Sequence, residues 1–341
     1  MQPGWQVLFT EMIHHPLHRI LPLILISLVS NVTVYASEAP DDAASWLNRM
    51  SKAMSAKSFK GTFVYQGYGD MVAMKILRVN DKNGSRERLI SLNGAHGEVI
   101  RDHQGVTCKL PNVNPLVVDK RGFRKIFPTK MINVLNQASG LYIISMKKAH
   151  QVAGRNTRVV NIIPTDNLRY GYRVWLDEDS GLLLKSQLID SSGKILEQLM
   201  YTSIEVYDDP PASLGQSIPA QITKDVQDNS IEFSEAGEAG DFTWQVDNLP
   251  KGFALAEYNM ETLQRHKKFE HLVYTDGLAS VSVFIERTNK KPSFIGTSHM
   301  GAVTAYGSMI DQHQVTVVGE VPPETLRLMI NSVRNTSEKL H

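Results

Sequence analysis

The chain has 341 residues, of which 42% are hydrophobic and 21% charged; this composition is typical of a globular protein and excludes wholesale disorder. Its formal net charge of +1 offers no broad field for nucleic acid or for acidic lipid, and we predict no nucleic-acid partner. The single cysteine, Cys108, excludes an internal disulfide and a zinc ribbon.

Residues 1–36 have the pattern of an export signal. A short basic start ends at Arg19, an apolar run follows, and Ala36 fits the small-residue position before a signal-peptidase cut. We expect cleavage that leaves Ser37 as the mature terminus and a soluble protein in the periplasm. A true start at Met12 and an uncleaved anchor are the alternatives.

Residues 37–207 are predicted to form a first domain that opens with a helix. Trp46, Leu47 and Met50 recur at helical spacing, and Asp41 or Asp42 is placed to cap the first turn. From Phe59 the hydrophobic period changes to two, which predicts strands joined by tight turns. The predicted strands are FKGTFVYQ, DMVAMKILRV, SRERLISLNG, EVIRDHQGVTCKL, RNTRVVNIIP, LRYGYRVWLDE, SGLLLKSQLID and KILEQLMYTSIEV. Helical spacing returns only in PTKMINVLNQAS.

A linker and a second domain follow. The stretch 208–222 contains Pro210, Pro211 and Pro219, which predicts an exposed connector without helix or central strand. Residues 223–336 mix strand patterns with one final helix that begins at the prolines of PPETLRLMINSV. The predicted strands here are FTWQV, GFALAEYNM, EHLVYTDGLASVSVFIER and HQVTVVGEV.

Three consecutive acids, Asp177, Glu178 and Asp179, stand beside Trp175 and raise the question of acid/base catalysis. Alternating strand patterns lie on both sides, and Gly181 fits a turn position with positive φ. We therefore predict a hairpin loop whose carboxylates point into water, with no burial to separate their pKa values.

No other pattern predicts catalysis or a cofactor. His96, His103 and Cys108 lie close in sequence but lack the tight spacing of a metal site or a nucleophile motif. Cys108 alternates with apolar residues and is interpreted as a small core residue. We predict no catalytic residue, no metal and no cofactor.

Two basic clusters, KRGFRK at Lys120 and RHKKFEH at Arg265, are typical of solvated surfaces, and contact with an acidic protein segment or a lipid phosphate is the alternative. The candidates for partner contact are in the second domain: Arg265, His266, Lys267, Lys268 and Arg287.

The first domain has more apolar strand surface than its helices can cover. A curved sheet wrapped on the first helix would leave an apolar groove, whereas packing of both faces into core is an equally good reading. The candidate groove residues are Phe63, Tyr65, Met74, Ile76, Leu89 and Ile100.

The hairpin VWLDEDSGLLLKSQL resembles that of the periplasmic lipoprotein carriers LolA and LolB. Together with WLNRMSKAMSAKSFKGTFVYQ, LPKGFAL and HQVTVVGEVPPETLRLMINSV, it is more similar to the RseB/MucB family of sigma-E regulators. The resemblance spans nearly all of the chain after the leader.

The resemblance implies an α+β protein: a half-closed antiparallel β-barrel wrapped on a helix, then a smaller α+β domain with an antiparallel sheet. It also implies binding of the periplasmic region of the membrane-bound anti-sigma factor RseA, which shields RseA from the protease DegS. Release would follow the sensing of acyl chains of mislocalised lipoprotein or lipopolysaccharide. The family has no catalytic residues to transfer, and a homo-oligomer stays an open possibility.

Two other functions stay open at this point. A LolA-type lipoprotein carrier would need only the first domain, and a periplasmic hydrolase would have to use His96, His103 and Cys108.

Overall fold

The computed structural model describes residues 42–336 except 68, 83, 95–96, 103–104, 110–115, 119–139, 220–242, 264–266 and 290. The described residues belong to one compact unit, Ala39–His341. In the part of the chain that is described, no helix is long and apolar enough to cross a membrane. The predicted leader and the segment PTKMINVLNQAS lie outside the described residues.

The first helix, α1 (Ala43–Ala56), forms as predicted. Asp42 caps it, since its carboxylate accepts a hydrogen bond of 2.6 Å from the amide of Ser45. Leu47 and Met50 are fully buried on the face that carries the helical apolar pattern.

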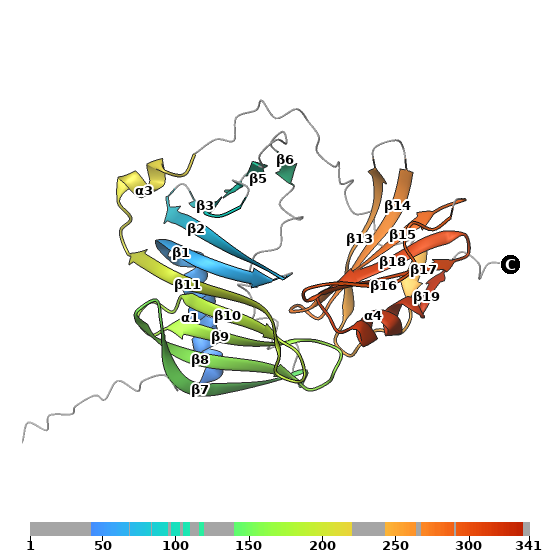
Figure 1. Ribbon diagram of the computed structural model, residues 1–341, viewed down its shortest axis with the longest axis horizontal. Helices are drawn as coiled ribbons and strands as arrows, with labels where there is room; N and C mark the ends of the chain where they lie inside the picture. Colours follow the sequence, from blue (N-terminus) through green and yellow to red (C-terminus); the bar gives the residue numbers. More distant parts are fainter. Residues whose placement is uncertain are drawn as a thin grey trace, which may run out of the picture. The chain divides into compact units, whose positions relative to one another are not determined.

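In the first sheet, described strands that follow each other in the chain are also neighbours, except that the sixth and seventh do not pair and the first pairs with the last as well as with the second (Figure 1). Its strands are β1 (Ser58–Gly67), β2 (Asp70–Asp81), β3 (Gly84–Ser91), β4 (Glu98–Arg101), β5 (Val106–Lys109), β6 (Leu116–Val118), β7 (Tyr142–Val152), β8 (Arg155–Pro164), β9 (Gly171–Asp177), β10 (Leu183–Ile189) and β11 (Ile195–Tyr207). Across the sheet the order is β6-β5-β4-β3-β2-β1-β11-β10-β9-β8-β7, with antiparallel pairing. In the described part of the chain β6 and β7 are edges and do not pair with each other, so a half-closed barrel stays a prediction.

The helix α1 covers one face of this sheet, and in Figure 1 it passes behind β8, β9 and β10. Val160, Ile162 and Val174 point to that face and have no exposed surface. Strand alternation then places their sequence neighbours on the opposite face. We call the side that α1 covers the helix face of the first sheet, and the opposite side its outer face.

The proline-rich stretch contains a helix, contrary to the prediction of a connector without helix, although most of its described residues are exposed. A short helix, α3 (Ala212–Gln216), begins directly after Pro211. Leu214 and Ile218 are buried against Leu77 and Val79 of β2. Proline is compatible with a helix start, and the apolar residues that follow have a surface to pack on. The domain boundary itself stays a prediction.

The second sheet has the order β13-β14-β15-β18-β17-β16, and a small two-stranded sheet pairs β12 with β19. The elements are β12 (Trp244–Val246), β13 (Ala254–Leu263), β14 (Lys267–Thr275), β15 (Ser280–Arg287), β16 (Gly296–Met300), β17 (Val303–Ile310), β18 (His313–Gly319), α4 (Pro323–Ile330) and β19 (Val333–Asn335). The final helix starts at its prolines, as predicted.

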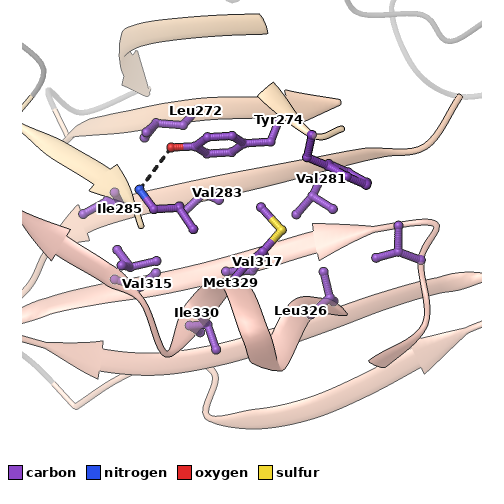
Figure 2. Packing of buried hydrophobic residues seen from close by; sticks show 14 of the residues in the cluster. Leu272, Tyr274, Val281, Val283, Ile285, Val315, Val317, Leu326, Met329 and Ile330 are labelled. Carbon is purple, nitrogen blue, oxygen red and sulfur yellow. Dashed lines mark hydrogen bonds between the residues drawn. The ribbon is translucent and has the colours of Figure 1, made fainter. Parts of the chain in front are cut away.

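The core of this part lies between the sheet and α4 (Figure 2). Leu326, Met329 and Ile330 of the helix pack on valines and isoleucines of β15 and β18. Tyr274 is buried among them, and its hydroxyl accepts a hydrogen bond of 3.2 Å from the backbone amide of Val246. Both parts of the chain are thus mostly antiparallel sheet with few helices.

Candidate functional site

Five of the six predicted groove residues share the helix face of the first sheet. Phe63 lies opposite Met74, and the alternation of β1 and β2 places Tyr65 and Ile76 on the same side. Leu89 follows on β3, opposite Ile76.

Burial divides these five residues. Phe63, Ile76 and Leu89 are buried in a common hydrophobic cluster, where the ring of Phe63 lies 5.5 Å from that of Tyr201. Tyr65 and Met74 are only partly buried, and the Tyr65 hydroxyl donates a hydrogen bond of 2.8 Å to Glu197. A binding groove on this face stays a prediction, with Tyr65 and Met74 as its accessible residues.

The sixth residue, Ile100, lies on the opposite face from the other five. It pairs with Arg88 of β3, whereas the neighbouring pair Val99–Leu89 faces the helix. Ile100 is buried on the outer face, so it cannot line the same groove as Phe63.

A charged group beside these apolar residues was missed by the sequence analysis. Glu87 accepts hydrogen bonds from Arg78 at 3.1 Å and from Arg101 at 2.9 Å, all three being largely buried on the helix face. Burial and the charge of Glu87 raise the pKa of the nearby Tyr201 hydroxyl. The alternation in SRERLIS was the available signal, because it places Glu87 on the face of Leu89.

The three acids do form a hairpin turn, as predicted. The amide of Asp177 donates to the carbonyl of Leu182 at 2.8 Å, and Gly181 has a φ of +78°. Glu178 pairs with Arg158 at 2.9 Å, and Asp179 is exposed. No two of these carboxylates converge on a shared cavity.

Asp177, however, does not point into water. Its carboxylate is buried and accepts two hydrogen bonds of 2.9 Å from Arg155, and another from the Ser180 hydroxyl at 2.5 Å. Burial acts to raise the pKa of Asp177, but the bonds from Arg155 and Ser180 outweigh it and hold the pKa below its usual value. The carboxylate is a structural anchor of the turn.

Replacing Asp177 with asparagine should lower the free energy of unfolding by about 2–3 kcal/mol, since charged hydrogen bonds are lost at a buried site. The matched change Asp179→Asn should stay within about 0.5 kcal/mol. Because the folded-state pKa of Asp177 is lowered, its contribution is full above the unfolded pKa of about 3.9 and is lost as the pH falls below it. Urea unfolding of both variants at neutral and acidic pH checks this, and equal stabilities would contradict it.

The other candidates are only partly described. His96, His103, Arg265, His266 and the Lys120 cluster lie outside the described residues. Cys108, Lys267 and Lys268 are placed on β5 and β14 by their backbones, and Arg287 is exposed at the end of β15. Within the described residues no group of three or more potential metal ligands gathers.

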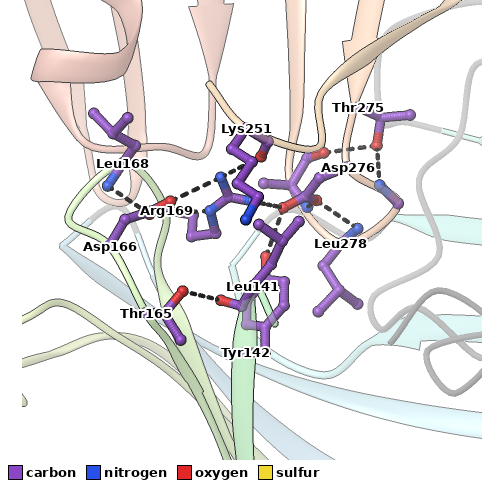
Figure 3. Close-up of polar contacts among 12 residues, drawn as sticks. Leu141, Tyr142, Thr165, Asp166, Leu168, Arg169, Lys251, Thr275, Asp276 and Leu278 are labelled. Carbon is purple, nitrogen blue, oxygen red and sulfur yellow. Dashed lines mark hydrogen bonds and ion pairs between the residues drawn. The ribbon is translucent and has the colours of Figure 1, made fainter. Parts of the chain in front are cut away.

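A buried polar cluster connects segments far apart in the sequence (Figure 3). Arg169, after β8, donates to Asp276 at 2.5 Å, and neither side chain has any exposed surface. The same guanidinium donates to Asp166 at 3.0 Å and to the carbonyl of Lys251 at 2.7 Å. The Tyr142 hydroxyl completes the cluster by donating to Asp276 at 2.8 Å.

We call these residues the Arg169 cluster, and its tyrosine is held in the neutral form that donates to Asp276. Burial raises the pKa of the Tyr142 hydroxyl, and the adjacent Asp276 raises it further. Asp276 is also fixed by the amides of Leu278 and Ala279 at 2.9 and 2.8 Å. Nearby, the Thr325 hydroxyl donates to the carbonyl of Leu168 at 2.6 Å. The cluster therefore ties the β8–β9 loop to the β14–β15 turn and to α4.

Two family models match nearly all of the described chain. The MucB/RseB N-terminal domain matches residues 42–226, and the MucB/RseB C-terminal domain matches residues 238–334. The chain belongs to the MucB/RseB family. The predicted resemblance is thereby confirmed over both parts of the chain.

Relatives in this family are regulators of sigma factors. The sigma factor AlgU regulatory protein MucB of Pseudomonas aeruginosa is 30% identical, over 91% of this chain and 96% of its own length. The sigma-E factor regulatory protein RseB of Haemophilus influenzae is 25% identical, over 92% of this chain and 96% of its own length.

The MucB/RseB fold is also known from crystal structures. A structure of MucB in complex with MucA(peri) is 30% identical, covers 86% of this chain and 99% of the solved chain, and has a TM-score of 0.65. The names of these relatives describe the regulation of sigma factors, and the absence of catalysis stays a prediction.

Proposed function

We propose that this protein is a periplasmic negative regulator of the envelope stress response that binds the periplasmic region of a membrane-bound anti-sigma factor, the counterpart of RseA. The observation that carries the proposal is the likeness to MucB, which was crystallised with MucA(peri) and matches 86% of this chain. The match to MucB/RseB domain models in both parts of the chain, and to a sigma-factor regulator over 91% of it, supports the proposal.

The bound anti-sigma segment would be shielded from its first protease, a DegS-type enzyme. Such protection needs only that the cleavage site is covered or held in an uncleavable conformation. Shielding therefore requires no catalytic group in this protein. The acids of the Asp177 hairpin can then have the structural role that their ion pairs indicate. The predicted leader would deliver the protein to the compartment that contains the partner.

Release would follow the binding of acyl chains from lipoprotein or lipopolysaccharide on the helix face of the first sheet. Tyr65 and Met74 offer accessible apolar surface there, and methionine adapts its shape to a flexible chain. Phe63, Ile76 and Leu89 are already buried, so deeper entry of an acyl chain requires α1 and the sheet to separate.

A lipid can release the partner only by binding more tightly to a partner-free arrangement. The coupling is reciprocal, and a typical value of about 1–3 kcal/mol corresponds to about 5- to 150-fold in affinity. The Arg169 cluster is the element that fixes one arrangement of the chain, because its buried ion pair breaks if the two segments move apart.

Titration calorimetry with the periplasmic region of the anti-sigma factor, with and without a saturating lipidated peptide, tests the proposal. We expect binding that weakens by about 5- to 150-fold when the lipidated peptide is present. The same peptide without its acyl chains is the control.

Absence of binding to the anti-sigma segment would reject the regulator. Transfer of a bound lipoprotein to an acceptor membrane would instead support the LolA-type carrier. Equal affinity with and without lipid would leave a passive shield without a lipid switch.

A further inference from the structure

The outer face of the first sheet carries three ordered rows of side chains that cross β7 to β11. In the first row, Ile143 of β7 lies opposite Ile163 of β8. Ile189 of β10 lies between Gly171 of β9 on one side and Ile195 of β11 on the other. The second row joins Asn161, Arg173, Gln187 and Gln198. The third row joins Lys147, Val159, Trp175, Lys185 and Met200.

The isoleucine row is exposed at both ends. Ile143 has 61% of its surface exposed and Ile195 has 46%. Between them the row crosses five strands, or about 19 Å at the usual strand spacing. In the middle of the row, an added Cβ on Gly171 would lie 3.0 Å from the carbonyl oxygen of Ile162 and 3.3 Å from the Ile189 side chain, so this position has no room for a side chain. Ile189 is itself only 4% exposed, so the accessible apolar surface of the row lies at Ile143 and Ile195, on a face that α1 does not cover.

The other two rows are cationic. In the described part of the chain, no carboxylate pairs with Lys147, Arg173 or Lys185. Arg173 donates a hydrogen bond of 3.1 Å to the side-chain oxygen of Asn161, and the Lys185 ammonium lies 4.5 Å from the centre of the Trp175 ring. Partial burial and the positive charge of Arg173 lower the pKa of Lys185. These cations repel each other and would be stabilised by an external anion.

Exposed isoleucines beside lysines are a combination that favours the interface of an anionic bilayer. The apolar side chains enter the acyl boundary, while the cations remain at the level of the headgroups. An acidic protein segment would satisfy the cations equally well but would leave the two exposed isoleucines uncovered. The pairing of both features on one face therefore favours a lipid surface.

We propose that the outer face of the first sheet, with Ile143, Ile195, Lys147, Arg173 and Lys185, docks on an anionic membrane surface. This contact is separate from the acyl-chain binding on the helix face and does not depend on the anti-sigma partner. It would hold the protein at the membrane in the orientation that leaves α1 and its face of the sheet turned away from the lipid.

Flotation with lipid vesicles tests this inference. The full chain is expressed with its leader, purified from the periplasm and incubated with vesicles of phosphatidylcholine alone or of equimolar phosphatidylcholine and phosphatidylglycerol. We expect binding to the anionic vesicles only, weakening as salt is added. Lys147→Gln with Lys185→Gln should reduce the affinity by about 25-fold, at about fivefold for each cation near an anionic surface.

Two further variants make the result specific to this face. Ile143→Ser with Ile195→Ser should also weaken binding, whereas the matched change Lys251→Gln with Lys291→Gln, at exposed lysines of the second part of the chain, should have little effect. Unchanged melting temperatures would show that all variants remain folded.

Failure of the natural protein to float with anionic vesicles would overturn the inference. Equal binding by the Lys147/Lys185 variant and its matched control would overturn it as well. If that variant instead lost affinity for the anti-sigma segment while no vesicle bound, the face would belong to the protein partner.

Discussion

Replacing Arg169 with methionine should lower the free energy of unfolding by about 3–5 kcal/mol, because it leaves the buried Asp276 carboxylate without its cation. Asp276 would retain the bonds from Tyr142 and from two backbone amides, but its charge would remain in a site without exposed surface. The carbonyl of Lys251 would also lose its donor. Urea unfolding followed by tryptophan fluorescence measures the change.

The control for this substitution is Arg173→Met. Arg173 is a half-buried arginine on the outer face that donates a hydrogen bond to the neutral side-chain amide of Asn161, so its loss should cost no more than about 1 kcal/mol. Equal costs for the two variants would show that the Arg169 cluster contributes nothing special. If Arg169→Met also separated unfolding into two transitions, the cluster would be what makes the two parts unfold together.

Replacing Phe63 with alanine should cost about 3–5 kcal/mol, the usual range for a large aromatic side chain removed from a core. Phe63 is 1% exposed and packs on Tyr201, so the change leaves a cavity between β1 and β11. Thermal unfolding of the variant checks this value.

Val64→Ala is the matched control, since Val64 neighbours Phe63 but is half-buried on the outer face. We expect it to cost less than about 1.5 kcal/mol. A small cost for Phe63→Ala would mean that Phe63 lines an open groove, contrary to the burial in this structure.

Sequence patterns predicted those helices and turns whose stabilising residues are close together in the chain. The capped helix from Ala43, the hairpin at Gly181 and the helix that starts at Pro323 all depend on signals within a few residues. Strand β7 was missed, although Tyr142, Ile144 and Met146 alternate, because the lysines and histidine that follow dilute the pattern. Strand β16 was missed because GTSHM carries little apolar signal, and its partner β17 was missed as well.

What sequence reasoning could not supply are contacts between distant residues. Arg169 and Asp276 are 107 positions apart, and each resembles an ordinary loop residue until the fold brings them together. The burial of Asp177 depends in the same way on Arg155 from the neighbouring strand. The face on which Ile100 lies is set by the register in which β4 pairs with β3. The sequence of a short strand beside a polar turn does not determine that register.

The most direct test of the proposed regulator is the cleavage rate of its partner. The periplasmic region of the anti-sigma factor from the same organism is incubated with its DegS-type protease, with and without an equimolar amount of this protein. We predict that cleavage slows when the protein is added and recovers when a lipidated peptide is added. An unchanged cleavage rate at concentrations where the two proteins bind would contradict the proposal that this chain shields an anti-sigma factor.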